Sequence, residues 1–298
     1  MAKIDTSKLT TGELIDLSKE ITLVGVQDTP FMSYLLANNQ IDTANSKVAT
    51  WRKKELDTTA DVGIVEGADA TTFYNSSRAE LSNVMEIFYK AVSISGTTSA
   101  ININGIPNLL QEELTDRLTE IKVNAENKLI NGVKDDGSLD PFIRRMDGLA
   151  SWIPAKNAVE TAGALEESHI KSAIRKIWDS GISNGHYLGF ANADVKEQID
   201  ALYESKYSYQ ALTTDFGLVV YRILTNYGNM DLIIERNIPA KKLFVISPKF
   251  FKLTYLRKPA FEMLAKAGDS IKGHCVMEAT LKCLNPAACA SMEITAGV

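Results

Sequence analysis

Cysteine and histidine, the residues that most often build metal and redox sites, are scarce in this chain. Its 298 residues include three cysteines and three histidines. The cysteines, Cys275, Cys283 and Cys289, are odd in number and form no Cys-x-x-Cys motif, and the histidines lack the spacing of a zinc or haem site. We therefore expect reduced, buried thiols, no disulfide framework, no metal centre and no cofactor.

Long apolar runs and an excess of basic residues are also missing. No stretch reaches the roughly 18 to 20 apolar residues that a membrane-spanning helix needs, and residues 1–5 do not begin a signal peptide. We therefore expect a cytosolic chain without a membrane partner. The 32 Lys and Arg against 37 Asp and Glu give a net charge of −5, unlike the basic footprint of a dedicated DNA reader.

What is present is the composition of a globular protein, with 45% apolar and 23% charged residues. The clearest helical pattern covers residues 106–131. Pro107 suits the first turn and Gly132 suits the position after the end. One apolar stripe of helical period is formed by Leu110, Leu114, Leu118, Ile121, Ala125 and Leu129, and the opposite face carries Glu112, Glu113, Asp116, Glu120 and Lys122. We interpret that charged face as a solvated or subunit-facing surface.

Two strand patterns, at 47–56 and 81–95, flank a stretch of 24 residues without a period, and they predict a long hairpin. The second strand is partly apolar on both faces, which calls for cover on both sides. One face carries Val84, Phe88, Val92 and Ile94, and the other carries Met85, Ile87 and Tyr89. The hairpin either binds another molecule or is an ordinary sheet with a flexible insertion.

The remaining patterns mix helices and strands, so the fold class is α+β. Residues 1–45 form an arm, with a short helix possible after Thr10 and another after Pro30. Further predictions are helices at 166–180 and 194–204, the second capped by Asp194, and strands at 186–191, 216–224, 230–235, 243–247 and 272–285. The last strand alternates and is expected to be antiparallel and half-buried, with Cys275 and Cys283 facing the core.

Catalytic motifs are weak. Gly181 to Gly185 matches the G-x-S-x-G pattern of a serine hydrolase with Ser183 as nucleophile, but that motif needs a strand before it and a helix after it. Here the predicted order is reversed, and Gly181 fits the end of a helix better. We do not expect an enzyme, and a hydrolase acting through Ser183 is kept as an alternative.

The tightest basic cluster is Trp51-Arg52-Lys53-Lys54. It could meet nucleic acid phosphates or acidic side chains of a neighbouring subunit, and the acidity of the whole chain favours the second.

Four stretches in order along the chain resemble major capsid proteins of tailed bacteriophages, and the resemblance runs from about Ile21 to Ala290. The stretches are Thr29-Pro30-Phe31-Met32-Ser33, Val65-Glu66-Gly67-Ala68-Asp69-Ala70, Leu264-Ala265-Lys266-Ala267-Gly268-Asp269-Ser270 and Glu278-Ala279-Thr280-Leu281. The resemblance implies the Hong Kong 97 capsid fold: an N-terminal arm (1–45), an extended-loop hairpin (46–100), a peripheral domain with its spine helix (101–160), an axial domain (161–240), and returning peripheral strands (241–298).

The resemblance also implies pentamers and hexamers of this chain in an icosahedral shell around double-stranded DNA, assembled in a bacterial cytoplasm with a portal protein. Because the first family-like stretch begins at Thr29, we expect any scaffolding protein to be separate. Expected inter-subunit contacts are Trp51, Arg52, Lys53, Lys54, Glu66 and Phe88 in the hairpin and, on the spine, Glu112, Glu113, Asp116 and Glu120. A cellular nanocompartment shell of the same fold is the first alternative, and the hydrolase acting through Ser183 is the second.

Overall fold

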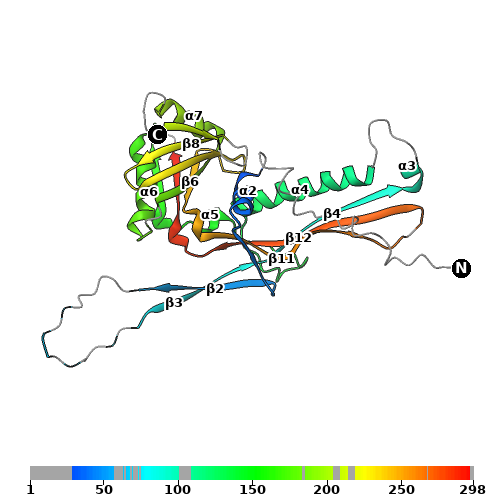
Figure 1. Ribbon diagram of the computed structural model, residues 1–298, viewed down its shortest axis with the longest axis horizontal. Helices are drawn as coiled ribbons and strands as arrows, with labels where there is room; N and C mark the ends of the chain where they lie inside the picture. The colour runs from blue at the N-terminus through cyan, green and yellow to red at the C-terminus, as the bar shows by residue number, and fades with distance from the viewer. Residues whose placement is uncertain are drawn as a thin grey trace.

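The computed structural model describes residues 29–56, 63, 65–67, 69, 73, 75–100, 109–182, 185–203, 209–213, 219–266 and 268–295. The molecule is elongated, with a hairpin projecting from one side, a long helix over a narrow sheet on the other, and a wider sheet with helices at one end (Figure 1). None of the helices in these ranges combines the length and apolarity needed to cross a bilayer.

The first described helix, α2 (Pro30–Ala37), packs into the centre of the molecule. Pro30 occupies its first turn, and Phe31, Met32 and Leu35 are fully buried. The helix predicted after Pro30 is confirmed, whereas the possible helix after Thr10 lies outside the described residues. Part of the expected arm therefore belongs to the core.

A four-stranded sheet with the order β1-β11-β12-β4 forms the narrow part of the molecule. Its strands are β1 (Ile41–Thr43), β11 (Phe251–Met263), β12 (Ser270–Cys283) and β4 (Glu86–Ser95), and only the β1–β11 pair is parallel. A short helix, α3 (Gly96–Ala100), follows β4.

The spine helix, α4 (Leu109–Asn131), lies along this sheet (Figure 1). Its 23 residues make it about 35 Å long. The predicted stripe is confirmed, because Leu114, Leu118, Ile121, Ala125 and Leu129 are all buried in one core with β4 and β12. Placing Lys122 on the exposed face was wrong: this side chain is buried, as is the unpredicted Glu126.

Two strand predictions need correction. The strand expected at 81–95 is interrupted at Met85 and divides into β3 (Ser77–Val84) and β4, which pair in different sheets. On β4, the face with Phe88 is buried against the spine core, but Ile87 and Tyr89 are exposed, so only one face is covered by its own chain.

The strand expected at 272–285 is antiparallel as predicted but is not half-buried. Thr280 and Glu278 on its polar face are buried too, because the chain also covers that side and Arg144 pairs with Glu278 there. All three cysteines are free and buried, as expected.

The wider sheet has seven strands in the order β5-β13-β10-β6-β9-β8-β7. They are β5 (Ala158–Ala162), β13 (Cys289–Thr295), β10 (Lys242–Ile246), β6 (Gly185–Ala191), β9 (Gly228–Ile234), β8 (Val219–Thr225) and β7 (Tyr209–Thr213). Pairs β5–β13 and β6–β9 are parallel and the others antiparallel.

Alternation along β6 gives this sheet two buried faces. Tyr187 and Ala191 join a core with the helices α6 (Glu167–Asp179) and α7 (Ala193–Tyr203), whereas Leu188 and Phe190 join the core of α2 and the spine. The apolar face predicted for α6 is confirmed, but Asp194 is not the cap of α7: it lies within the helix, and its N–H donates to Asn192 at 3.4 Å.

Short helical turns connect these elements: α5 (Leu149–Trp152), η3 (Ala155–Asn157), η4 (Pro248–Phe250) and η5 (Pro286–Ala288).

Candidate assembly surfaces

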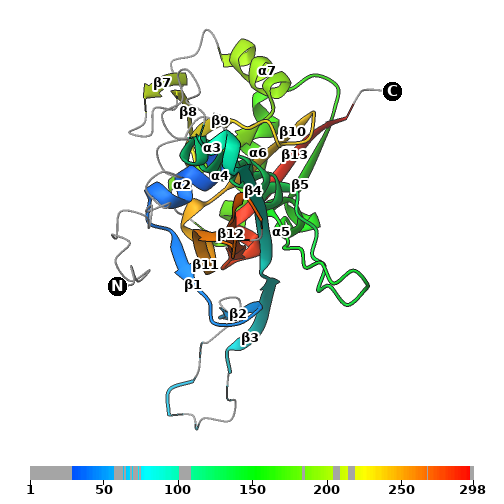
Figure 2. The same cartoon turned by 90° about the vertical axis from the view of Figure 1, so that its right-hand side faces the viewer.

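The projecting hairpin consists of β2 (Val48–Glu55) and β3, paired antiparallel from Val48 opposite Val84 to Glu55 opposite Ser77. It extends well away from both larger sheets, as both views show (Figures 1 and 2). The hairpin predicted around the stretch 57–80 is therefore confirmed for the stem, although β3 begins at Ser77 and shortens the stretch between the strands to 56–76. Most of that intervening stretch lies outside the described residues, but Glu66 is described and exposed.

The base of the hairpin is fixed to the body. The indole N–H of Trp51 donates to the carbonyl of Cys283 at 2.8 Å, and its ring lies 5.7 Å from that of Trp152. The side-chain amide of Asn83 donates to the carbonyls of Leu281 and Asp147 at 2.8 and 2.9 Å. These bonds hold the direction in which the hairpin leaves the sheet.

Two residues expected at an inter-subunit contact lie instead inside their own chain. Trp51 is 8% exposed at the hairpin base, and Phe88 is 7% exposed beneath the spine helix. Both side chains contribute to intramolecular cores, so the contact proposed below does not use them.

The outer stem has one strongly basic face. Arg52 and Lys54 lie on the same side of β2, opposite Glu80 and Arg78 of β3, and all four are exposed. Lys54 and Arg78 are like charges placed directly across the ladder, an arrangement that weakens a strand pair on its own. Lys53 points to the other face and is half-buried. Three cations therefore face solvent with one carboxylate among them.

The four acidic residues of the spine that were expected at a subunit contact fall into two groups, those paired within the chain and those without an ion pair to another described residue. Arg117 pairs with Glu113 at 3.1 Å and also with Glu120, and Lys90 of β4 pairs with Glu120 at 3.0 Å. The hydrogen bond from Lys90, followed by that from Arg117, lowers the pKa of Glu120. Glu112 and Asp116 are exposed, and no ion pair joins either of them to another described residue. Their charges are available to a second molecule.

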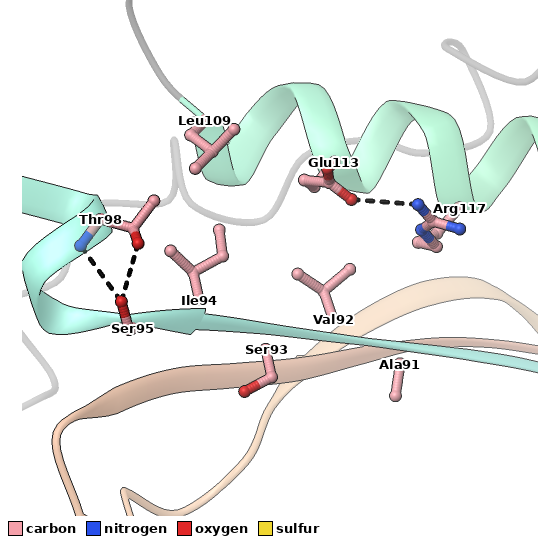
Figure 3. A pocket seen from close by; sticks show the side chains of 9 residues that line it. All are labelled: Ala91, Val92, Ser93, Ile94, Ser95, Thr98, Leu109, Glu113 and Arg117. Carbon is pink, nitrogen blue, oxygen red and sulfur yellow. Dashed lines mark hydrogen bonds and ion pairs between the residues drawn. The ribbon is translucent and has the colours of Figure 1, made fainter. Parts of the chain in front are cut away.

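A pocket of about 290 Å³ opens beside this acidic face, between the first turns of the spine, β4 and α3 (Figure 3). Val92 and Ile94 form its apolar floor, and Glu113 and Arg117, paired with each other, are its charged groups. The hydroxyls of Ser95 and Thr98 bond to one another at 2.8 Å at its other end. Its charges are thus neutralised by its own chain.

A third surface is the loop of residues 133–147 that follows the spine helix. Sequence patterns did not reveal it. It is anchored by Arg144, which pairs with Glu278, and by paired backbone hydrogen bonds between Asp135 and Arg145 at 3.0 and 2.9 Å. Outward it exposes four large apolar side chains: Val133, Leu139, Phe142 and Ile143. Their exposure has no local sequence signal, because isolated apolar residues in a turn-rich segment usually return to the core.

A family model described as SU10 major capsid protein matches residues 4–296. The chain belongs to this family. No curated protein matches significantly.

Solved structures agree with the family in fold. The chain is similar to the capsid of cyanophage A-1(L), with a TM-score of 0.67, 11% identity, and coverage of 90% of this chain and 93% of that one. It is similar to the SrpI encapsulin of Synechococcus elongatus PCC 7942, with a TM-score of 0.60, 12% identity and coverage of 85% and 84%. Mycobacterium phage Bobi gives a TM-score of 0.58, 12% identity and coverage of 87% and 89%.

The fold of this SU10-family protein is therefore the Hong Kong 97 capsid fold, and its function is that of a major capsid protein. Family membership places it in the virion and implies self-association into a shell. The encapsulin shares the fold, but the family model favours the phage capsid over the nanocompartment alternative.

The hydrolase alternative gains nothing from the described residues of this capsid protein. Ser183 itself lies outside them. Helix α6 precedes the motif and strand β6 follows it, the reverse of a nucleophile elbow. Gly181 has φ of 80° just after the helix end, as predicted, and nearby His186 lies 3.8 Å from Asp231, which Arg222 already holds through two bonds.

Proposed function

We propose that this major capsid protein assembles as pentamers and hexamers into a closed icosahedral shell around packaged double-stranded DNA. Within a capsomer, the basic face of one hairpin contacts the acidic face of the spine helix in a second copy. The observation that carries this proposal is the opposite charge of two exposed surfaces, Arg52, Lys54 and Arg78 on the hairpin and Glu112 and Asp116 on the spine. Glu66 and Lys53 lie outside this charge pairing and are further proposed inter-subunit contacts of the hairpin.

Unpaired apolar surface supports self-association as well. The loop of residues 133–147 exposes Phe142 and Leu139, and the outer face of β4 exposes Ile87 and Tyr89. Exposed apolar patches mark protein contacts, and a shell buries such groups repeatedly by symmetry.

Each hairpin–spine contact is expected to be weak, so a stable shell depends on many copies of that contact. Exposed ion pairs contribute about 0.2–1 kcal/mol each, so a single hairpin binds weakly. Closure of the shell makes each contact intramolecular with respect to the others and raises the effective affinity. The role is structural and requires no catalytic residue.

The sheet topology supports a revised outline of the domains. Strands β5, β10 and β13 lie in the same seven-stranded sheet as β6 and β9, although they fall in parts of the chain expected to be peripheral. We assign them to the axial domain, and we assign β4 to the peripheral sheet rather than to the hairpin.

Further partners follow from the proposed role. A portal protein and a separate scaffolding protein would join assembly in the bacterial cytoplasm. Packaged DNA would touch the wall only weakly and without sequence preference, because the chain carries a net charge of −5. A strongly basic inner wall in an assembled shell would contradict this last point.

The first test is the mass of the recombinant particle, measured by analytical ultracentrifugation with electron micrographs of the same fractions. Shells or capsomer rings are the expected result, either alone or after co-expression with the neighbouring phage genes. A chain that stays monomeric under both conditions would overturn the proposal.

A charge exchange tests the contact itself. We expect the double variant Arg52→Glu/Lys54→Glu to lose most particle formation, and Glu112→Lys/Asp116→Lys to do the same, because each pairs like charges. Combining the four changes should restore particles at least partly, since opposite charges meet again. Lys156→Glu, at an exposed lysine elsewhere, is the matched control and should assemble normally. Failure of the combined variant to exceed the two doubles would refute this pairing while leaving the capsid role intact.

A further inference from the structure

Three parts of the molecule meet at a pair of buried carboxyl groups. Glu126 comes from the spine helix, and Glu235 directly follows β9 of the seven-stranded sheet. The third part is the N-terminal end of α2. Neither glutamate contributes to the assembly surfaces described above, since both are almost completely enclosed. A buried, ionisable pair at such a junction requires an explanation, because two enclosed charges of one sign strongly destabilise a fold.

Glu126 acts as the cap of a helix that is remote in sequence. Its Oε1 accepts the backbone N–H of Phe31 at 2.7 Å, and its Oε2 accepts that of Met32 at 2.8 Å. Thr29, which stands at the usual capping position of α2, makes no side-chain cap bond. The carboxylate therefore satisfies free N–H groups and interacts favourably with the positive end of the helix dipole.

Glu235 is held in place on one oxygen only. Its Oε1 accepts both the backbone N–H of Asn237 at 2.9 Å and the side-chain amide of Asn237 at 2.7 Å. Its Oε2 is buried and, in the part of the chain that the structure describes, receives no N–H or O–H donor. The side chain of Glu126 is within hydrogen-bonding reach of that of Glu235.

Burial raises the pKa of both carboxyls, and repulsion between their two charged forms favours the binding of one proton by the pair. The other charged and titratable groups nearby come from all three parts. Arg236 lowers the pKa of Glu235, but less than burial raises it, and Lys122 is buried one turn before Glu126. From the α2 side comes Tyr34, whose pKa is raised by burial and then by Asp231.

We propose that Glu126 and Glu235 hold one proton between them and form a proton-dependent latch that fastens α2 to the spine helix and to the seven-stranded sheet. The bonding places the proton on Oε2 of Glu235, because both oxygens of Glu126 already accept N–H groups and Oε2 has no other donor. In this form Glu235 donates to Glu126, and the carboxylate of Glu126 holds α2. Loss of the proton leaves two facing carboxylates, whose repulsion loosens the junction and releases α2.

The sign of the pH dependence follows from linkage. Because the folded pair binds a proton more tightly than the unfolded glutamates, whose pKa is 4.5, the folded state carries more protons above that pH. The pair's contribution to stability is complete below the unfolded pKa and falls as the pH rises toward the folded value. Attachment of α2 is therefore weakest in alkali.

Hydrogen exchange of the full-length chain, read by mass spectrometry from about pH 6 to about pH 10, tests the latch. Exchange times are scaled to the chemical rate at each pH. We expect the amides of α2 to lose protection by about tenfold or more over this range, relative to the amides of α6. Glu235→Gln should abolish that loss, because its amide donates to Glu126 at every pH. Glu197→Gln, at an exposed glutamate of α7, is the control and should behave as the unmodified chain.

Two results would overturn the latch: α2 protection that follows α6 at every pH, or a Glu235→Gln chain with the same loss as the unmodified protein. Should that variant fail to fold, infrared spectroscopy of the unmodified chain decides. A protonated carboxyl band is expected at neutral pH and should disappear in alkali together with α2 protection. Its absence at neutral pH would end the proposal.

Discussion

Strands β3 and β4 follow one another along the chain with only Met85 between them, yet β3 belongs to the hairpin and β4 to the four-stranded sheet. One face of β4 is covered by the spine helix and contributes Phe88, Val92 and Ile94 to the main core. The outer half of β3, residues 77–80, is exposed on both faces and pairs only with β2. An isolated two-stranded ladder is marginally stable in water, so the outer stem has little to hold it within its own chain.

This difference matches the proposed division between residues that fold the subunit and residues that join subunits. Changes on the covered face of β4 should alter the free energy of unfolding, and changes on the outer stem should alter assembly. Changes at the hairpin base, which lies between β4 and the outer stem, should alter both the free energy of unfolding and assembly.

The largest effect on unfolding is expected for Phe88→Ala. Removing this ring leaves a cavity beneath the spine and should lower the free energy of unfolding by about 3–5 kcal/mol, measured by urea titration of the monomer. Tyr89→Ala, the next residue and 54% exposed, is the matched control, with an expected loss below about 1 kcal/mol. Equal losses at the two positions would show that β4 is not covered on one side only.

An intermediate effect is expected for Asn83→Ala at the hairpin base. The substitution leaves the buried carbonyl of Leu281 without its side-chain donor, and should lower the free energy of unfolding by about 1–3 kcal/mol. It should also increase hydrogen exchange in β2, since the hairpin loses one of its attachments. Ser77→Ala at the outer end of the same strand should change neither quantity. Unchanged exchange in β2 would mean that Asn83 is not needed to hold the hairpin.

The smallest effect on unfolding, below about 0.5 kcal/mol, is expected for Arg52→Ala combined with Lys54→Ala. Both side chains are exposed, and removing Lys54 also relieves its repulsion with Arg78. The particle yield should nevertheless fall several-fold, unlike that of Lys156→Ala. If unfolding changed strongly and assembly did not, the division between folding and joining residues would be wrong for the stem.

Periodicity in the sequence predicted the helices that bury one continuous apolar face. The stripe from Leu114 to Leu129 and the apolar face of α6 needed no more than helical spacing. Strand β11 was missed because Pro259 and its charged neighbours interrupt the alternation. The structure accommodates them with register shifts between Tyr255 and Ala260, beyond the short stretch that pairs with β1.

The candidate surfaces were predicted less completely, because exposure is decided by tertiary structure. Strand alternation puts Arg52 and Lys54 on one face of β2, and the helical spacing of the spine puts Glu112 and Asp116 outward. The same spacing could not show that Trp51 folds back onto Cys283. Nor could it join Glu126 to Glu235, since no local pattern links residues that meet only after two sheets have formed.

The facing cations Lys54 and Arg78 have a further consequence for the chain before it assembles. A projecting β-ladder offers unpaired backbone N–H and C=O groups along its edges, and newly made capsid protein is produced in many copies at once. Two hairpins that approached edge to edge would bring six cations together, a repulsion that disfavours indiscriminate strand addition. If the proposed contact holds, the charge that weakens the ladder in one subunit would also keep free subunits from polymerising through their hairpins before the acidic spine face of another copy pairs with it.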